Sequence, residues 1–444
     1  MTQNLFEFDV VVVGGGPAGL AAACAAAESK SRVALVDESP WLGGQIWRGQ
    51  QQAAKAKPNN SASLWIGRFR NSGAALLDGT AVVAAPRPGL LLTEHEEGPR
   101  QIRWKQLILA TGARELFLPF PGWTLPGVLG PGGLQALVKN GWPIQDKRVV
   151  VAGSGPLLLA VGEGLKKYGA KIVAIYEQAS QASVLRFGMG LWSRWGKLGQ
   201  ALKLRAATFG IPYQCGAWPV SAEGKSSLER VRLTDGKRNW SEECDYLACG
   251  FGMVPNVELP LALGCELKDD FVWVDNWQAT SVPNVYCAGE PTGICGADCA
   301  LVEGQIAGYA ATGNQTKAEA LLSNRKSWHR FRSALSASFA LRPELKSLAR
   351  EDTLVCRCED VTLGRIREFT GWREAKFQTR CGMGACQGRV CGAASKFLFG
   401  WSTESVRPPI LPAQVRSLIS QPASGCEMED KERAQSDSLH RLPQ

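Results

Sequence analysis

The segment from Phe8 to Asp37 constrains the fold of this chain more than any other. It opens with an apolar, β-branched run, FDVVVV, and continues with the glycine-rich residues GGGPAG at 14–19. An alanine-rich helix is predicted over 20–28 and a second strand over 32–36. A strand, a glycine turn, a helix and a strand that ends in an acidic residue are typical of a unit that binds a dinucleotide. The sequence therefore predicts an α/β fold built on a parallel sheet.

Each glycine of this turn has its own physical task in such a unit. Gly14 makes the tight turn after the strand, Gly16 lets the backbone approach a pyrophosphate, and Gly19 lets the helix pack on the sheet. The N-terminus of the helix then faces the phosphates, and Asp37 can accept hydrogen bonds from a ribose diol. The predicted nucleotide contacts in this segment are Gly14, Gly16, Pro17, Ala18, Gly19, Asp37 and Glu38.

Three later segments indicate which dinucleotide is bound. Gly43-Gly44-Gln45 lies shortly after the acidic residue, LILATGA at 107–113 predicts a strand that ends in a glycine turn, and VYCAGE at 285–290 predicts a later strand. Together they resemble the FAD domain of two-dinucleotide flavoproteins, in which these segments line the flavin and its linker. The resemblance implies FAD contacts from Gly44, Gln45, Val82, Thr111, Gly112, Gly289 and Glu290. Glu290 stands where the family usually has aspartate, so its carboxylate would lie in a slightly different place beside the ribityl chain.

A second unit of the same kind follows. A strand over 148–152 leads into Gly153-Ser-Gly155-Pro-Leu-Leu158, and a helix and a strand that ends at Glu177 come next. Leu158 replaces the third glycine of the pattern, which prevents the closest approach of helix and strand. In nicotinamide-using relatives the corresponding domain binds NAD(P)H. Here we expect the fold to be kept with a degraded pocket, or with one used for an adenine nucleotide, ATP or NAD. Glu177 would suit an unphosphorylated ribose, and a purely structural domain is the alternative.

The stretch from Val355 to Gly392 carries five cysteines, as Cys356-x-Cys358, Cys381 and Cys386-x4-Cys391. Two close pairs separated by 27 residues, with glycines around the second, indicate four thiolates that hold a [2Fe–2S] cluster. Eight Lys or Arg against six Asp or Glu between residues 351 and 400 would partly offset the negative charge of the cluster. Zinc also takes four thiolates, although Cys-x-Cys is tighter than the usual zinc spacing. Buried cysteines without a ligand are the third interpretation.

The sequences VCRCEDV and TRCGMGACQGRVC within this stretch resemble the bacterioferritin-associated ferredoxin type of [2Fe–2S] domain. More narrowly, they resemble the version fused to the C-terminus of alpha subunits in the flavoprotein family of opine oxidases, D-hydroxyproline dehydrogenases and hydrogen cyanide synthase. The resemblance implies Cys356, Cys358, Cys386 and Cys391 as the cluster ligands and leaves Cys381 as a spare. The second pair is two residues wider than the Cys-x2-Cys of the free-standing domain.

These segments predict an α/β chain of two Rossmann-like dinucleotide-binding domains, the second inserted in the first, followed by a small helical [2Fe–2S] domain. The FAD domain is expected at 1–120 and 251–320, and the second nucleotide-binding-like domain at 146–250. A connecting helix is expected at 321–350, the [2Fe–2S] domain of bacterioferritin-associated ferredoxin type at 351–405, and a disordered polar tail at 421–444.

Charge and hydropathy exclude several classes of protein. The 444 residues carry a formal net charge of +9 without a run of six basic residues, which argues against a nucleic-acid-binding protein. The chain has no apolar run of 18 residues, so no membrane span is predicted. The first strand begins near Asp9, which leaves no room for a signal peptide. We therefore expect a cytoplasmic protein with reduced thiols and, at most, a peripheral link to the membrane of the respiratory chain.

Residues for substrate chemistry are scarce. The chain has three histidines, and each of them is predicted to be solvated rather than to act as a general base. No catalytic residue is therefore predicted. Arginines that could converge on a substrate carboxylate are scattered along the sequence. The histidines are His95, His329 and His440, and the arginines are Arg48, Arg114 and Arg186.

A flavin and a one-electron cluster in one chain, without recognisable substrate chemistry, predict an electron-transfer subunit. The resemblance covers residues 9–406 and implies an alpha subunit whose beta partner is a second flavoprotein that carries the substrate site. A small ferredoxin-like gamma subunit completes some of these complexes, whose substrates are D-hydroxyproline, opines or glycine. A stand-alone NAD(P)H-dependent ferredoxin-type reductase is the alternative, and Leu158 counts against it.

Overall fold

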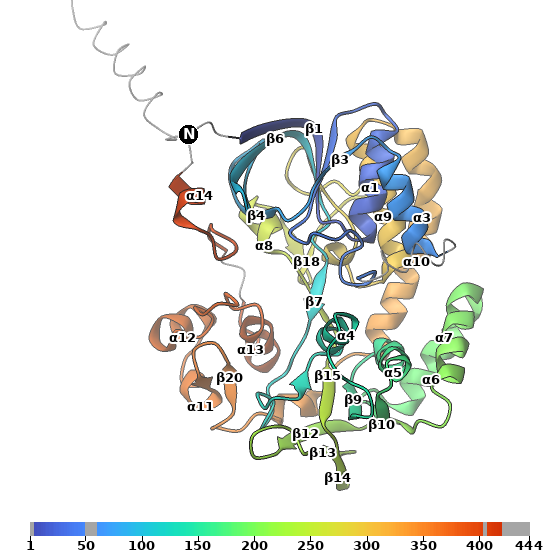
Figure 1. Ribbon diagram of the computed structural model, residues 1–444, viewed down its shortest axis with the longest axis vertical. Coiled ribbons are helices and arrows are strands. Elements are labelled where there is room, and N and C mark those ends of the chain that lie inside the picture. Colours follow the sequence, from blue (N-terminus) through green and yellow to red (C-terminus); the bar gives the residue numbers. More distant parts are fainter. Residues whose placement is uncertain (1–3, 49–59, 403–405, 420–444) are drawn as a thin grey trace, which may run out of the picture.

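The computed structural model describes residues 4–48, 60–402 and 406–419 of the chain. Two domains, the first built on a mixed and mainly parallel sheet and the second on a parallel one, lie one above the other in Figure 1, and a small cysteine-rich domain lies beside the lower one. The predicted tail at 421–444, including His440, lies outside the described residues. None of the helices in the described ranges is long and apolar enough to span a bilayer.

The first sheet is built around β1 (Asn4–Val13), the strand that the FDVVVV run predicted. It pairs in parallel with β2 (Val33–Val36) on one side and β6 (Gly98–Leu109) on the other, and Val13 is opposite both Val36 and Leu109. Because the three strands end level, the glycine turn, Asp37 and Thr111 follow at one edge of the sheet. The other strands are β3 (Ala75–Leu77), β4 (Ala81–Arg87), β5 (Leu90–His95) and β19 (Val285–Cys287).

Two helices from opposite ends of the first domain pack side by side, α1 (Pro17–Ala27) and α9 (Ala297–Ala311) (Figure 1). Glycine makes this contact possible, because a Cβ at Gly304 would lie 2.1 Å from the carbonyl oxygen of Ala18. The helix α3 (Ser61–Arg70) also packs on α1. The two sequence segments of the predicted FAD domain therefore form one packed unit.

The second sheet has the strand order β11-β10-β9-β15-β8, and all its strands are parallel. The strand β8 and the helix α4 precede residue 146, so this domain includes residues that the prediction did not assign to it. The strands are β8 (Val128–Leu129), β9 (Arg148–Gly153), β10 (Lys171–Glu177), β11 (Tyr213–Cys215) and β15 (Tyr246–Gly250). The helices are α4 (Pro131–Lys139), α5 (Leu157–Lys167), α6 (Gln181–Gly190) and α7 (Trp195–Ala207). A small antiparallel sheet contains β12 (Trp218–Glu223), β13 (Arg230–Thr234) and β14 (Asn239–Glu243).

The chain passes between the two domains through β7 (Ala113–Glu115) and returns through β16 (Met253–Pro255). These strands pair in antiparallel fashion, with Ala113 opposite Pro255. The second domain is therefore inserted in the first, as predicted. Short elements complete the two domains: α8 (Glu258–Ala262), β17 (Leu267–Lys268), β18 (Phe271–Val272) and single turns at Leu191–Ser193, Glu290–Thr292 and Pro343–Ser347.

The helix α10 (Gln315–Ser338) leads to the cysteine-rich domain and begins and ends earlier than the predicted connecting helix at 321–350. The cysteine-rich domain has its own small core, which includes Val355, Ile366 and Trp401. Beyond it the chain returns to the first domain, where Ile410 is buried, and this return was not predicted. The last elements are β20 (Leu354–Cys356), β21 (Val361–Thr362), α11 (Leu363–Ile366), α12 (Trp372–Thr379), α13 (Cys391–Phe399) and α14 (Val415–Ile419).

Candidate functional site

The glycine turn after β1 is packed so tightly that two of its glycines have no room for a side chain. Gly14 has φ +108°, and a Cβ there would lie 2.2 Å from the carbonyl oxygen of Ala110. A Cβ at Gly19 would lie 1.7 Å from the carbonyl oxygen of Gly14. At Gly16, no atom of the described residues lies within 4 Å of the Cβ position, so the turn is open to a ligand there. This geometry suits a pyrophosphate at the start of α1, which begins with Pro17 and Ala18.

Asp37 lies against this turn. Its carboxylate accepts hydrogen bonds from the backbone N–H groups of Gly15 and Ser39, the latter at 2.7 Å. Burial raises the pKa of Asp37. The next residue, Glu38, is exposed. Of the two predicted ribose contacts, only Asp37 is therefore attached to the glycine turn.

The Gly-Gly-Gln segment packs on the same turn, although it lies far from it in sequence. The Gly43 N–H donates to the carbonyl oxygen of Gly15 at 2.8 Å, and a Cβ at Gly44 would lie 3.0 Å from the Cα of Gly16. Gln45 is exposed. Val82, by contrast, has its side chain in the core of the first domain, so any nucleotide contact from this residue would come from its backbone.

Thr111 and Gly112 are bonded to Asn256, which follows the return strand β16. The Thr111 hydroxyl donates to the carbonyl oxygen of Asn256 at 2.6 Å, and the Asn256 side-chain amide donates to the carbonyl oxygen of Thr111 at 2.8 Å. The Asn256 N–H also donates to the carbonyl oxygen of Gly112 at 3.0 Å. The two crossings between the domains therefore hold the predicted flavin segment in place.

Glu290, at the end of the VYCAGE segment, has one carboxylate oxygen that accepts a hydrogen bond and one without a partner among the described residues. Its Oε1 accepts a hydrogen bond from the Gly296 N–H at 2.8 Å. Its Oε2 is buried, and no partner for it exists among the described residues. Burial raises the pKa of Glu290 to about 7. Because buried polar atoms are nearly always paired, Oε2 is an acceptor that a ribityl hydroxyl of FAD would satisfy, and the site fits the predicted cofactor on this point.

A buried carboxylate on α9 holds the same segment. Glu303 is 1% exposed and accepts hydrogen bonds from the Gly289 N–H at 3.0 Å, the Thr292 hydroxyl at 3.0 Å and His329 Nε2 at 3.1 Å. Burial alone would raise the pKa of Glu303, but the His329 hydrogen bond and the charges of nearby arginines outweigh it and lower the pKa. His329, predicted to be solvated, is 30% exposed and is also bonded to this buried carboxylate. A glutamate inside the apolar helix at 297–311 was the signal that sequence reasoning missed.

In the second domain, the glycine loop after β9 is covered by the segment that follows α10. The Ser154 hydroxyl donates to the carbonyl oxygen of Phe339 at 3.1 Å, and the Gln178 side-chain amide donates to that of Ala340 at 3.1 Å. The Arg342 N–H donates back to Gln178 Oε1 at 3.2 Å. We call residues 339–342 the strap. It contacts the loop at Ser154, while at Gly155, the equivalent of Gly16, no atom of the described residues beyond its chain neighbours lies within 4 Å of the Cβ position.

Glu177 repeats the arrangement of Asp37. It is fully buried, and its carboxylate accepts from the Gly155 N–H at 2.7 Å and the Ala179 N–H at 2.8 Å. Burial raises its pKa to about 7. Leu158 is also buried and packs in the core of the domain. Glu177 therefore holds the second glycine loop in the way that Asp37 holds the first.

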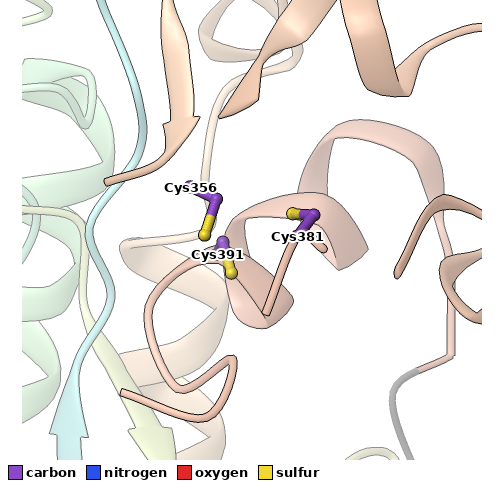
Figure 2. Close-up of side chains that lie close together, drawn as sticks. All are labelled: Cys356, Cys381 and Cys391. Atoms are coloured by element: carbon purple, nitrogen blue, oxygen red, sulfur yellow. The ribbon is translucent and has the colours of Figure 1, made fainter. Parts of the chain in front are cut away.

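Three cysteines of the C-terminal domain converge in Figure 2. The sulfur atoms of Cys356, Cys381 and Cys391 all lie within 4.8 Å of one another, and all three residues are buried. Hydrogen bonds from the Cys381 and Cys391 thiols lower the pKa of Cys356 to about 2. The Gly382 N–H also donates to Cys356 Sγ at 3.5 Å. Cys381, the predicted spare, is thus part of the buried group.

The other two predicted ligands lie at the rim of this group. Cys358 is exposed and Cys386 is half-buried. A hydrogen bond from Cys391 lowers the pKa of Cys386 to about 5, and the Cys358 thiol bonds to Cys386. Thiol hydrogen bonds therefore connect all five sulfurs, although only those of Cys356, Cys381 and Cys391 lie within 4.8 Å of one another. A purely sulfur donor set suits an iron–sulfur cluster or zinc.

Arg114 joins the first domain to this sulfur group. Its Nε donates to the carbonyl oxygen of Arg389 at 3.1 Å, while its Nη1 donates to Asn256 Oδ1 at 2.8 Å and pairs with Glu258 at 2.9 Å. The charge of Arg114 is close enough to Cys386 to interact with it. Because its charge is already paired with Glu258, Arg114 is a poor carboxylate clamp of the kind that the scattered arginines could have formed.

The comparison with known proteins agrees with this geometry. A family model described as pyridine nucleotide-disulphide oxidoreductase matches residues 8–308. Hydrogen cyanide synthase subunit HcnB of Pseudomonas protegens is 31% identical over 419 residues, which cover 86% of this chain and 89% of that protein. An opine oxidase subunit from Rhizobium meliloti is 31% identical over 455 residues, which cover 91% of this chain and 97% of that protein.

Solved structures share the fold. L-proline dehydrogenase from P. horikoshii matches with a TM-score of 0.69 at 20% identity, over 94% of this chain and 80% of that chain. Thioredoxin reductase from T. acidophilum matches with a TM-score of 0.53 at 24% identity, over 70% of this chain and 99% of that chain. The second match is limited to a smaller share of the chain than the first.

Replacing Glu290 by alanine should weaken FAD binding about fivefold, because an ordinary hydrogen bond contributes about 1 kcal/mol. The measurement is the flavin-to-protein ratio after gel filtration, together with the Kd for FAD added back to the apoprotein. Glu266→Ala, at an exposed glutamate of the same domain, is the control and should retain FAD like the wild type. Equal retention by both variants would contradict the assignment of Glu290.

Proposed function

The chain belongs to the pyridine nucleotide-disulphide oxidoreductase family, and we propose that it is the FAD- and [2Fe–2S]-containing electron-transfer subunit of a multisubunit dehydrogenase that acts on CH–NH donors. In this proposal a second flavoprotein subunit oxidises D-hydroxyproline, an opine or glycine, and this chain passes the electrons to an acceptor. FAD, when bound, accepts electron pairs and can release single electrons. The similar opine oxidase and hydrogen cyanide synthase proteins are themselves named as subunits.

The observation that carries this proposal is the bridge made by Arg114. The residue follows Thr111 and Gly112, the predicted flavin segment, and it donates to the backbone of Arg389 between two of the cysteines. A second bond joins the same region to the other cysteine pair, since Trp123 Nε1 donates to the carbonyl oxygen of Leu354 at 2.6 Å. Two separate contacts thus attach the cysteine-rich domain to the stretch of chain between the two larger domains, which supports a relay from the flavin to the sulfur group.

A substrate site on this chain finds little support. The arginine nearest the predicted flavin segment is engaged with Glu258 and Asn256, and His329 is bonded to buried Glu303. Dehydrogenation of an amino acid at a flavin needs a held carboxylate and a place for a proton. This supports the assignment of the substrate site to a partner subunit.

A surface for that partner is available on α6 and α7. The large apolar side chains exposed on these helices and on the turn that joins them include Leu185 (59%), Met189 (65%), Trp192 (63%) and Trp195 (71%). Between residues 178 and 222 the sequence has five basic residues and no acidic ones. We call these four side chains the tryptophan surface. Exposed tryptophans beside basic residues are typical of protein interfaces, and the expected partner face is apolar with an acidic rim.

Replacing Arg114 by methionine should lower the reduction potential of the cluster by about 50 mV, because a nearby positive charge favours the reduced, more negative state. The measurement is a redox titration of the full-length protein followed by EPR, with iron content as a check on assembly. The control is Arg365→Met, which removes an exposed charge from the cysteine-rich domain and should shift the potential of the cluster much less. Equal potentials in both variants would exclude a role for Arg114 beside the cluster.

NADH and NADPH should reduce the bound flavin more slowly than about 1 s⁻¹, below the ordinary range of enzyme turnover. The reason is that the strap bonds to Ser154 on the second glycine loop and Leu158 occupies the position of the third glycine. Anaerobic stopped-flow absorbance at the flavin band measures the rate, and photoreduction of the same sample shows that the flavin can be reduced. Bleaching by either nucleotide at tens per second would favour the alternative, a stand-alone NAD(P)H-dependent ferredoxin-type reductase.

The isolated chain should not oxidise amino acids, whereas the complex purified from native cells should. The assay is turnover of D-hydroxyproline, proline, glycine and opines with a phenazine acceptor.

The same purification, carried out with the double variant Trp192→Ser/Trp195→Ser, should recover at least tenfold less partner and activity, because buried tryptophans at an interface contribute about 2 kcal/mol or more. Trp273→Ser, at another exposed tryptophan, is the control. Turnover by the homogeneous isolated chain would place the substrate site on this chain and refute the proposal.

A further inference from the structure

Cys381 has a different environment from the cysteine that it would replace. Its side chain is fully buried, within 4.8 Å of the sulfurs of both Cys356 and Cys391. Cys358 is exposed, and its thiol bonds to Cys386 at the rim of the group. In the sequence, Cys358 is the close neighbour of Cys356. In the fold, the sulfur of Cys381, which follows another element, lies beside that of Cys356.

The backbone around Cys381 holds it in place without any metal. The preceding residue, Arg380, adopts the left-handed conformation at φ +64° and ends α12. The Cys381 N–H donates to the Thr379 hydroxyl at 3.2 Å, and that hydroxyl donates to the carbonyl oxygen of Ala375 at 2.6 Å. On the other side, Gly382 packs so closely on Trp372 that a Cβ would lie 2.6 Å from its ring. The position of the Cys381 sulfur is therefore set by the packed end of α12.

The loops of the two cysteines are also joined directly. Arg380 Nε pairs with Glu359, the neighbour of Cys358, at 2.7 Å. A shift of the metal from one thiol to the other would therefore occur between two loops that already contact each other. Neither loop would need to unfold, because Cys381 already lies beside two of the other sulfurs.

We propose that Cys381 is a reserve ligand of the metal centre, which takes the place of Cys358 when that exposed thiolate is lost. One metal–sulfur bond, to Cys358, breaks and another, to Cys381, forms. When an alkylating agent forms a bond to the Cys358 sulfur, its leaving group departs as an anion; the Cys381 thiol gives up its proton as it binds, and this proton balances the released anion, so the exchange needs no oxidant. The inference rests on the proposed function for the identity of the metal, a [2Fe–2S] cluster, and goes beyond it in assigning a fifth ligand.

The exposure of Cys358 explains why the metal centre would need a reserve ligand. An exposed thiolate is the one that solvent-borne oxidants or alkylating agents reach first. A centre that lost a ligand at this position without replacement would release its metal. With Cys381 available, the remaining ligands are three of the four predicted ones, Cys356, Cys386 and Cys391, together with a buried thiolate that such reagents do not reach.

The test compares metal content in anaerobically purified full-length variants, with alanine used because it cannot bind metal. Cys381→Ala should keep the wild-type content of iron and acid-labile sulfide. Cys358→Ala should keep at least half of it, with altered g values in the reduced-state EPR spectrum. The double variant Cys358→Ala/Cys381→Ala should keep less than a tenth. A matched double variant, Cys358→Ala/Cys215→Ala, removes a thiol of the second domain instead and should match Cys358→Ala alone.

Either of two results would overturn the inference: Cys358→Ala as depleted as the double variant, or the double variant as rich in metal as Cys358→Ala. Retained FAD and an unchanged near-ultraviolet circular dichroism spectrum show that each variant is folded. If the wild type contains stoichiometric zinc and no iron, the proposed electron-transfer function fails, while zinc content in the same variants still decides the role of Cys381. A wild type that binds neither metal would refute both.

Discussion

The close approach of backbones at glycine is the constraint on which the rest of this structure depends. The turn after β1 folds back until the Cβ position of Gly19 lies 1.7 Å from the carbonyl oxygen of Gly14, and α9 approaches α1 as closely at Gly304. A side chain at either point would push apart the strand and the two helices. Because Gly289 also packs on Ala18, the same contacts determine where the VYCAGE segment lies. The segments predicted to line the flavin therefore depend on one tightly packed helix, α1.

Buried carboxylates stabilise the loops that this packing leaves at the sheet edges. Asp37 and Glu177 each accept two backbone N–H groups, one from the glycine turn of their own domain and one from the residue two positions on. Since a buried N–H without a partner is costly, these acids contribute to folding whether or not a nucleotide is bound. The two domains differ elsewhere: the strap bonds to the second glycine loop at Ser154, and Leu158 stands in that loop where the first has Gly19.

The cysteine-rich domain is attached to the rest of the chain by side-chain contacts and not by its linker alone. Arg114 and Trp123 both belong to the stretch that leaves the first domain, and both donate to backbone carbonyl groups close to cysteines. Its core is small, with Val355, Ile366 and Trp401 among the few buried side chains. A domain of this size gains stability from such contacts, from a bound metal, or from both.

The sequence alone determined the two parallel-sheet units, the insertion of one in the other and the roles of Gly14 and Gly19, because strand periodicity and glycine turns are local patterns. It also located all five clustered cysteines, but it could not tell which of them meet. That depended on the turn at Arg380, a left-handed residue that no pattern predicts, which directs Cys381 into the buried group. The hydrogen bond between His329 and Glu303 and the strap over Ser154 likewise join elements distant in sequence. Both contacts depend on the packing of α10 against the two domains, because long-range contacts follow from tertiary geometry and not from local periodicity.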